Sequence, residues 1–431
     1  MRYPDHMKKK VVIVGGGFGG LAAARTLAKI DSLEILLIDR RNFHLFQPLL
    51  YQIAMAGLNP ADISAPLRTV FCGIKNVKII MAEVDKIDYQ NKQIHFDNRS
   101  ENYDYLILSC GVAHSYFGKN HWEEFAPGLK SLEQAIEIRK RILTAFELAE
   151  KTQDPIELQR CLNFVVVGGG PTGVELAGAI KEMASHTLKG DFRSADLTKT
   201  RVILVEAGPR ILPSFPDVLS KKATQSLLKL GVEVRTDTRA DELSHEGLKI
   251  GNEFIPTRTI LWAAGVKASK LASQLPGEKD PQGKVFVNTQ LSLVDFPEVF
   301  VIGDMAAFPS PKGETLPGIA PVAIQQEQFI HKIIRADLAG QKRPDFKYID
   351  KGIMATIGRS KAVAHTFGLN FSGTLAWLAW VFIHIIYLVS FKNQFFVFLQ
   401  WTWSYFTFGR GARLITYRSW RFYGSEKSKV D

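Results

Sequence analysis

The sequence predicts an α/β fold made of two Rossmann-like units and a C-terminal helical segment. Two glycine-rich turns, VVIVGGGFGG at 11–20 and FVVVGGGPTG at 164–173, each follow a short apolar strand and precede a helix-forming stretch. A third observation is an apolar, aromatic stretch at 371–408, whose one formal charge is Lys392. Two copies of a strand–turn–helix pattern indicate an internal duplication.

The first unit contains a turn of the spacing G-x-G-x-x-G, from Gly15, Gly17 and Gly20, followed by a helix expected from Leu21 to Ile30. The first glycine allows the tight turn, the second lets a pyrophosphate approach the backbone, and the third packs helix on strand. The next strand, EILLID, ends in Asp39, at about the ~20-residue spacing at which an acid accepts hydrogen bonds from a ribose. The ordered set predicts a dinucleotide site rather than a structural glycine turn.

The segments that join the two units are more varied. Residues 41–63 mix aromatic residues with Pro and Gly, and predict an irregular segment. Residues 77–96 predict two or three antiparallel strands, and the apolar run at 105–111 predicts a buried strand ending in small residues. A long polar helix, from about Ser131 to Lys151, leads into the second unit.

The second unit repeats the order of the first. Its turn carries Gly168, Gly170 and Gly173, and its next strand, RVILVE, ends in Glu206. A carboxylate at that position favours the free 2′-hydroxyl of NADH over the 2′-phosphate of NADPH. Arg210 follows closely enough to weaken that preference. The second turn therefore predicts an NADH site.

Two later strands complete the pattern. Residues 259–265 end in small residues, as 105–111 do, and the strand at 299–304 ends in Gly303 and Asp304. Two dinucleotide sites in one chain suggest a tightly held flavin used together with an exchangeable nicotinamide. Asp304 suits the ribityl hydroxyls of a flavin, while the helix after it would direct its N-terminus at the isoalloxazine.

Glu175 stands out because it lies just past the last glycine of the second turn, in the first turn of a helix expected over 173–186. Stabilisation of an acid by the helix dipole is worth about 0.3–1 kcal/mol. An anion at that place also competes with the pyrophosphate of the cofactor, so the dipole is a poor sole reason for it. A functional role is therefore favoured.

The charge balance and the cysteines restrict the class of protein. There are 54 Lys+Arg against 43 Asp+Glu, a net charge of +11, which suggests nucleic acid, an anionic membrane surface or anionic ligands. No zinc knuckle or helix-turn-helix signature accompanies this charge, so we expect no nucleic-acid partner. Cys72, Cys110 and Cys161 are widely spaced, as unpaired thiols in a reducing compartment are. We expect no metal site.

The C-terminal region combines apolar segments with a basic tail. Five of the seven tryptophans lie after residue 370, and the tail at 409–431 is rich in Lys and Arg. Residues 371–391 are apolar for roughly the 20 residues of a membrane crossing, and a second aromatic stretch follows at 394–406. One spanning helix, two helices lying in the membrane interface, and a buried core helix are the alternatives. A single crossing would put the basic tail outside, against the positive-inside tendency, so the interfacial pair is favoured.

Seven motifs occur in one order across nearly the whole chain: GGGFGG, FHLFQPLLYQIAMAG, VVVGGGPTGVELAG, VEAGPRILP, TILWAAG, VIGDMA and APVAIQQ. Together they resemble single-subunit, non-proton-pumping type II NADH:quinone oxidoreductases, which are two-dinucleotide-binding-domain flavoproteins of the glutathione reductase fold. The resemblance implies FAD and NADH as cofactors, and electron transport from NADH to a membrane quinone. It also implies peripheral, monotopic attachment to the cytoplasmic face of the inner (cytoplasmic) membrane.

This reading divides the chain into three parts. An FAD-binding domain comprises residues 8–115 and 290–350, and an NADH-binding domain comprises residues 116–289. Residues 351–431 form a membrane-anchoring region. A homodimer is kept as an open alternative to a monomer.

The site residues fall into four groups, most of them implied by the resemblance. The FAD group comprises Gly15, Gly16, Gly17, Phe18, Gly19, Gly20, Asp39, Arg40, Gln47, Pro48, Val84, Gly303 and Asp304. The NADH group comprises Gly168, Gly170, Gly173 and Glu206, and the strand-end glycines Gly111 and Gly265 are added as cofactor-binding positions. The quinone group comprises Ala320, Ala323, Gln325 and Gln326, with Pro321 where many members have Gln. Glu175 matches a family glutamate near the nicotinamide and the flavin, to which a proton-handling role is often given.

Two alternatives to an NADH:quinone oxidoreductase remain: a sulfide:quinone oxidoreductase and a non-enzymatic flavoprotein. Sulfide:quinone oxidoreductases share the fold but need a reactive cysteine pair beside the flavin, and no cysteine follows Cys161. Disulfide reductases need a CxxxxC motif that the first unit lacks. The alternative from another class is a non-enzymatic, membrane-associated flavoprotein that senses NADH, which would show slow turnover with every quinone.

Overall fold

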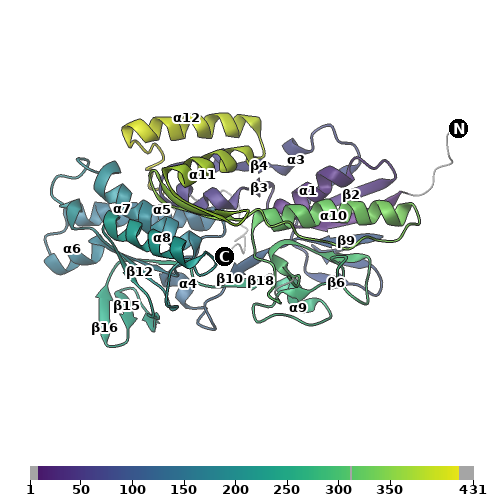
Figure 1. Ribbon diagram of the computed structural model, residues 1–431, viewed down its shortest axis with the longest axis horizontal. Coiled ribbons are helices and arrows are strands. Elements are labelled where there is room, and N and C mark those ends of the chain that lie inside the picture. Colours follow the sequence, from purple (N-terminus) through teal and green to yellow (C-terminus); the bar gives the residue numbers. More distant parts are fainter. Residues whose placement is uncertain (1–7, 311–312, 417–431) are drawn as a thin grey trace, which may run out of the picture.

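The computed structural model describes residues 8–310 and 313–416, and two parallel sheets form its frame (Figure 1). The first sheet has the strand order β20-β9-β1-β2-β5, and the second has the order β13-β12-β11-β17. The first comprises β1 (Lys9–Val14), β2 (Leu33–Asp39), β5 (Val77–Met81), β9 (Tyr105–Leu108) and β20 (Val299–Val301). The second comprises β11 (Asn163–Val167), β12 (Arg201–Val205), β13 (Val232–Arg235) and β17 (Thr259–Trp262). The near-continuous apolar sequences of the inner strands, such as β2 and β11, suit parallel strands that are buried on both faces.

The first sheet is built from two separate stretches of the chain, because β20 pairs with β9. Helices α1 (Phe18–Leu27) and α10 (Ala320–Leu338) lie side by side against it (Figure 1). Helix α1 begins earlier than the expected Leu21, directly at the glycine turn, with Gly17 as its N-cap. After β20 come the short helix η5 (Gly303–Met305) and the strand β21 (Ala306–Ala307), which pairs in parallel with β19 (Val285–Phe286).

The second sheet carries α7 (Pro171–Glu182) and α8 (Asp217–Leu230). Helix α7 begins at Pro171 rather than at the expected Gly173. Proline is well tolerated at the first position of a helix, because the N–H of that residue has no partner within the helix. A π-helical turn, η3 (Met183–Thr187), extends it. The polar helix predicted before this unit is α5 (Leu132–Lys151), which Ser131 caps by accepting a hydrogen bond from the N–H of Gln134.

The stretch predicted as irregular, 41–63, and the residues directly after it contain short elements with a buried side. These are β3 (Phe43–Leu45), η1 (Gln47–Leu49), α2 (Leu50–Ala54), η2 (Pro60–Asp62), β4 (Ser64–Pro66) and α3 (Leu67–Val70). The prediction of two or three antiparallel strands over 77–96 was wrong for β5, which pairs in parallel with β2. The antiparallel set comprises β6 (Lys86–Asp88), β7 (Gln93–Phe96) and β8 (Arg99–Asn102).

Two short strands connect the units. Strand β10 (Val112–His114) pairs in antiparallel fashion with β18 (Val266–Ala268). Gly111 and Gly265 precede these strands with φ of +66° and +75°, which glycine adopts at little cost. Small elements complete this region: α4 (Trp122–Phe125), α6 (Pro155–Leu162), η4 (Leu197–Lys199) and α9 (Lys270–Gln274).

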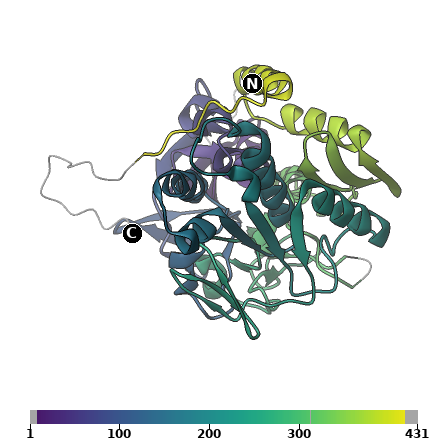
Figure 2. The same cartoon turned by 90° about the vertical axis from the view of Figure 1, so that its left-hand side faces the viewer.

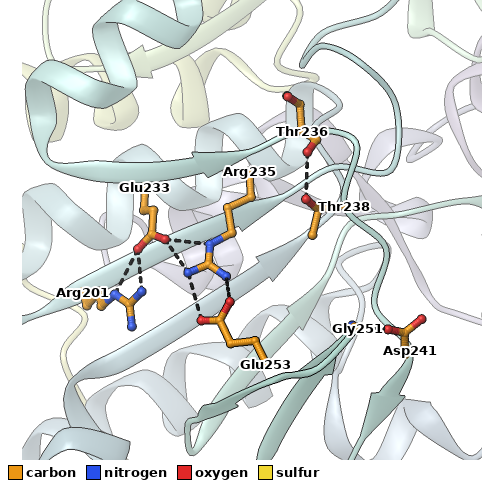
Figure 3. A network of polar contacts seen from close by, with 8 residues as sticks. All are labelled: Arg201, Glu233, Arg235, Thr236, Thr238, Asp241, Gly251 and Glu253. Atoms are coloured by element: carbon orange, nitrogen blue, oxygen red, sulfur yellow. Dashed lines mark hydrogen bonds and ion pairs between the residues drawn. The ribbon is translucent and has the colours of Figure 1, made fainter.

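A three-stranded antiparallel meander lies beside the edge of the second sheet. It consists of β14 (Glu242–Leu243), β15 (Gly247–Ile250) and β16 (Glu253–Pro256). Figure 3 shows how charged side chains fasten it: Arg235 contacts both Glu233 and Glu253, each with an N–O distance of 2.6 Å. Arg201 contacts Glu233 in turn at 2.8 Å.

The C-terminal region is a three-stranded antiparallel sheet followed by two helices. The strands are β22 (Ile353–Gly358), β23 (Lys361–Thr366) and β24 (Leu369–Gly373), and the helices are α11 (Thr374–Ile386) and α12 (Phe391–Thr407). Figures 1 and 2 show both helices on the outside of the molecule, with α12 uppermost. The apolar segment predicted at 371–391 is therefore divided, since its start belongs to β24 and Gly373 turns the chain with φ of +74°.

The outer faces of these two helices are apolar and exposed. Phe382 is 65% exposed, Phe391 82% and Trp403 69%, which contradicts the buried-core alternative. Among the described residues, no helix has both the length and the apolar character needed to cross a membrane. Most of the basic tail, residues 417–431, lies outside the described residues.

Candidate functional site

The two glycine turns have the same geometry, and each leaves space where a phosphate would lie. A Cβ atom on Gly20 would lie 1.8 Å from the carbonyl oxygen of Gly15, and one on Gly173 would lie 1.8 Å from that of Gly168. Around Gly17 and around Gly170, by contrast, a Cβ would meet no atom within 4 Å. The third glycine is thus needed for packing, while the second faces open space. This is the arrangement that a pyrophosphate requires, so both turns fit a dinucleotide.

Asp39 and Glu206, the acids that follow the second strand of each unit, hydrogen-bond to the backbone of the neighbouring glycine turn. The carboxylate of Asp39 accepts hydrogen bonds from the N–H of Gly16 at 2.6 Å and of Arg41 at 2.7 Å. The carboxylate of Glu206 accepts equivalent bonds from Gly169 at 2.6 Å and Gly208 at 2.7 Å. A charged acceptor of two N–H groups is fixed in direction. These bonds position both acids beside the turns, where the ribose-binding role was predicted.

Arg210 is occupied within its own loop. Its two terminal nitrogens donate to the carbonyl oxygens of Phe215 and Pro213, each at 2.8 Å. A guanidinium used in this way has fewer donors left for a 2′-phosphate. We therefore expect Arg210 to have little effect on the preference for NADH over NADPH that Glu206 sets.

His44 is a buried residue of β3 that contacts the first turn, and the sequence motifs did not single it out. Its Nδ1 lies 2.9 Å from the carbonyl oxygen of Gly16, and since a carbonyl only accepts, Nδ1 carries the proton. Burial lowers the pKa of His44, which favours the neutral ring. Together with Asp39 it holds both polar groups of the Gly16 backbone. The signal was present in the FHLFQP motif, but one histidine among aromatic residues reads as core.

The remaining FAD-group residues surround this turn at different depths. Phe18 packs edge-on against His44 and Phe46, whereas Arg40 and Gln47 are exposed and Pro48 is half-buried. Val84 is buried in the loop between β5 and β6. Asp304 lies beside Gly318, where a Cβ atom would come within 3.0 Å of the carboxyl carbon. Gly19 approaches Ile302 and the carbonyl of Ala323, so α10 meets α1 at this point.

The predicted quinone residues are used for packing between α10 and its neighbours. The buried Gln326 accepts a hydrogen bond from the N–H of Gly303 at 2.7 Å. The Gln325 amide both donates to the carbonyl of Ile349 and accepts from its N–H. Pro321 stands in the first turn of α10, where proline is well tolerated. The quinone role of this segment stays a prediction, and its two glutamine side chains already have partners.

Glu175 lies in the second turn of α7 rather than in the first, because the helix begins at Pro171. One turn further, a Cβ on Gly178 would lie 1.8 Å from the carbonyl oxygen of Ile357. Strand β22 therefore rests directly on α7 and covers Glu175, which accepts a hydrogen bond from the Thr356 backbone. Burial raises the pKa of Glu175 to about 8, although this hydrogen bond opposes the rise. The carboxyl is thus largely protonated at neutral pH.

The side chain of Glu175 lines a cavity that is partly open to solvent. The walls come from all three parts of the chain. Tyr51, Gln52, Met55 and Gly57 contribute from the first unit, and Glu175, Ala179, Glu182 and Thr187 from the second. The C-terminal region contributes Thr356, Gly358, Arg359, Trp377, Trp380, Val381, Trp401, Ser404, Tyr405, Phe408 and Arg410. An acid that is neutral at pH 7 in a partly apolar cavity is suited to proton transfer.

Stacked aromatic rings form one wall of this cavity. Trp380 lies between His384 and Trp401, with ring centroids 4.1 Å and 5.4 Å apart. The indole N–H of Trp401 donates to Gln52 at 2.9 Å, and the Gln52 amide donates to the hydroxyl of Tyr51 at 2.9 Å. Helices α11 and α12 are therefore fastened to α2. No sequence motif indicates that Tyr51 and Trp380 share a site, because they lie far apart along the chain.

The paired turns on two parallel sheets define the chain as an oxidoreductase of the pyridine nucleotide-disulphide class. The sequence profile of the pyridine nucleotide-disulphide oxidoreductases matches residues 9–326, and that of the NDH2 C-terminal domain matches residues 351–411. The chain is 42% identical over 425 residues to the type II NADH:quinone oxidoreductase Ndh of Mycobacterium tuberculosis, covering 95% of this chain and 90% of that one. The protein belongs to the type II NADH:quinone oxidoreductase family.

Solved structures agree on the fold. NDH2 from Plasmodium falciparum, in complex with NADH, matches with a TM-score of 0.86 at 21% identity, covering 94% of this chain and 99% of that chain. The sulfide:quinone oxidoreductase of Aquifex aeolicus matches with a TM-score of 0.73 at 18% identity, covering 90% and 92%. The family membership supports the type II reading over the sulfide-oxidising alternative.

Proposed function

We propose that this protein transfers a hydride from NADH to FAD and then two electrons to a membrane quinone, without pumping protons. The observation that carries the proposal is the cavity containing Glu175, which joins the two dinucleotide units under the C-terminal helices. When bound, FAD takes a hydride from NADH and passes two electrons on to a quinone. The work of the protein is to position the reactants, exclude water and supply a proton.

The first turn would hold FAD and the second NADH. The open sides of Gly17 and Gly170 leave room for the two pyrophosphates, and α1 and α7 direct their N-termini toward them. Asp39 and Glu206, fixed by backbone N–H groups, accept from the ribose hydroxyls. Asp304 remains the residue proposed for the ribityl chain. NADH is expected rather than NADPH, because Glu206 repels a 2′-phosphate.

Glu175 is the residue proposed to deliver a proton. Its carboxyl is neutral at pH 7 and lines the cavity beside Tyr51 and Thr356. A quinone seated there would meet a proton donor at one side and stacked aromatic rings at the other. We therefore propose that the quinone lies against Tyr51, Glu175 and Trp380. The prediction from the sequence, at Ala320–Gln326, stays untested.

Helices α11 and α12 are proposed to lie in the surface of the cytoplasmic membrane, on its cytoplasmic face. Their inner sides line the cavity, and their outer sides expose phenylalanine and tryptophan. Such a face suits the headgroup boundary of a bilayer. A lipid-soluble quinone would then pass from the bilayer into the cavity without crossing water.

The test is stopped-flow spectroscopy of the purified, FAD-loaded protein. Mixing with NADH should bleach the flavin absorbance near its visible maximum, and a short-chain quinone should restore it at a rate that supports turnover. If NADH bleaches the flavin but no quinone restores it within the turnover time, the NADH-sensing alternative replaces the enzyme.

A further inference from the structure

Phe117 is an exposed aromatic residue with an unfavourable backbone conformation. It is 71% exposed, and its φ of +51° lies in the left-handed region that bulky residues rarely adopt. Gly118 follows it with φ of +88°. Such a conformation persists only where the surrounding structure enforces it, and residues of this kind gather at ligand-binding sites. The place of Phe117 in the fold therefore decides what it can bind.

The loop that carries Phe117 follows β10 and is anchored to the end of β17. The N–H of Ser115 donates to the carbonyl oxygen of Gly265 at 3.3 Å. The carbonyl oxygen of Ser115 accepts a hydrogen bond from the indole N–H of Trp262 at 3.0 Å. The edge of the Phe117 ring touches Gly265, where a Cβ atom would lie 2.6 Å from Cζ of the ring. The missing side chain of Gly265 thus makes room for the ring.

The residues that follow β17 also border the second glycine turn. The N–H of Ala263 donates to the carbonyl oxygen of Val167 at 2.7 Å. A Cβ atom on Gly168 would lie 2.6 Å from the carbonyl carbon of Ala263. The short run from Ala263 to Gly265 therefore leads from the glycine turn directly to the ring of Phe117.

The strand order places this ring on one side of the predicted dinucleotide. In the order β13-β12-β11-β17, α7 leads from β11 to β12, whereas the meander leads from β13 to β17. The strand order thus reverses between β11 and β17, and parallel sheets bind ligands at such a point, beyond the carboxyl ends of their strands. Glu206 follows β12 and is proposed for the adenosine ribose. The nicotinamide end then extends to the side of β17, where Phe117 lies.

We propose that Phe117 is a binding residue for the nicotinamide ring of NADH. This rests on the function proposed above. Protein aromatic rings pack on flat rings in offset or edge-on arrangements, and most of the Phe117 ring is free for such a contact. The backbone conformation fixes the ring before the cofactor arrives, which lowers the entropic cost of binding. The exposure and the unusual φ of Phe117 thus have one common reason.

The experiment measures the binding of NAD⁺ and of ADP-ribose to the oxidised, FAD-loaded protein by isothermal titration calorimetry. NAD⁺ is used because NADH would reduce the flavin during the titration. ADP-ribose contains the adenosine, the pyrophosphate and the second ribose, but it lacks the nicotinamide ring. Phe117→Ala should raise Kd for NAD⁺ by about 3–10-fold, the loss expected for one aromatic contact, and should leave Kd for ADP-ribose within about twofold. Phe117→Tyr keeps the ring and should bind NAD⁺ as wild type does.

Steady-state kinetics provide a second measurement. Menadione serves as the quinone, and ferricyanide as a soluble acceptor that needs no cavity. Because NADH enters both reactions, Phe117→Ala should raise KM for NADH by a similar factor with either acceptor. KM for menadione should stay within about twofold, since Phe117 does not line the cavity that contains Glu175.

The matched control is Phe367→Ala. Phe367 is 77% exposed with φ of +48°, and Gly368 follows it with φ of +78°, so the two Phe-Gly pairs are alike in exposure and in backbone conformation. Phe367 lies in the turn between β23 and β24, not in the loops at the ends of β11, β12 or β17. Its variant should bind both ligands as wild type does. Thermal unfolding and the ratio of flavin to protein absorbance show whether any variant has lost its fold or its FAD.

The outcomes separate this inference from the proposed function. If NADH fails to bleach the flavin of wild type, the proposed function is wrong and the inference falls with it. If wild type is bleached but Phe117→Ala keeps Kd for NAD⁺ within about twofold, Phe117 does not bind the nicotinamide. An equal loss for NAD⁺ and ADP-ribose would assign Phe117 to the fold of the site. That result, or a loss that Phe367→Ala reproduces, also overturns the inference.

Discussion

A Cβ atom on Gly178 would lie 1.8 Å from the carbonyl oxygen of Ile357, so α7 and β22 are in direct backbone contact. This contact brings the C-terminal region over the nicotinamide unit. It also buries Glu175, which precedes Gly178 by about one helical turn. The last glycine of VVVGGGPTGVELAG therefore belongs to the assembly of the cavity, not to phosphate binding.

Gly178→Ala should separate these two elements. The added methyl group cannot be accommodated without moving backbone, and overpacking of this kind costs about 1–3 kcal/mol. We expect a lower Tm and a loss of menadione reduction greater than the loss of ferricyanide reduction, measured by thermal unfolding and steady-state kinetics. Equal effects of Gly178→Ala on both acceptors would contradict this account.

Substitutions of the two open glycines should separate the two cofactors. Gly17→Ala places a methyl group where the first pyrophosphate would lie, so the purified protein should contain less FAD. Gly170→Ala should keep its FAD and raise KM for NADH by about tenfold or more. Neither change creates a contact within the protein, so Tm of the FAD-free forms should stay near that of wild type. Flavin absorbance, NADH kinetics and thermal unfolding measure these effects, and FAD loss from Gly170→Ala would reverse the assignment.

Quinone reduction should depend on the protonation of Glu175. Burial raises its pKa to about 8, so the carboxyl holds a proton below that pH and loses it above. The rate with menadione should therefore fall as the pH rises through about 8, while the ferricyanide rate changes less. Glu175→Gln should be slower with menadione and should lack this fall. A menadione profile for Glu175→Gln that coincides with wild type would return Glu175 to a structural role.

The choice between NADH and NADPH should rest on Glu206. Wild type should prefer NADH, and Glu206→Gln should narrow the ratio of the two kcat/KM values by about tenfold, because the repulsion of a 2′-phosphate is removed. The amide can still accept a hydrogen bond from one of the N–H groups of Gly169 and Gly208, so the turn should survive. Arg210→Gln should leave the ratio within twofold, since its guanidinium already bonds to Phe215 and Pro213. A clear NADPH preference in wild type would defeat the assignment.

Attachment to membranes should depend on the outer face of α12. Phe398 is 52% exposed on this helix, and Phe398→Glu should reduce co-sedimentation with vesicles that contain anionic phospholipid. Phe254 is 50% exposed in β16, on the opposite side of the molecule in Figure 1, and provides a matched control. Phe254→Glu should bind vesicles as wild type does. Equal binding by both variants and wild type would show that α12 is not the contact surface.

The local patterns of the two units could be read from the sequence because they depend on neighbours in the chain. Apolar runs predict the central parallel strands, and the glycine spacing predicts each turn, including which glycine faces open space. Element boundaries were less accurate. Helix α7 begins at Pro171, two residues before the expected start. Strand β5 joins the parallel sheet by pairing with β2, and this pairing depends on tertiary packing rather than on the sequence of β5.

The sequence by itself determined the two strand–turn–helix units, their acids Asp39 and Glu206, and the apolar character of the C-terminal helices. Periodicity, backbone sterics and charge act over a few residues, so short stretches of sequence are enough to predict the elements that depend on them. Only the tertiary structure decided that Tyr51, Glu175 and Arg410 line one cavity. It also decided that the side chains of Gln325 and Gln326 hydrogen-bond to the backbone of Ile349 and Gly303. Strand β22, which lies far along the chain from Glu175, covers this residue, and the burial raises its pKa. No local pattern records the desolvation that such a distant segment brings.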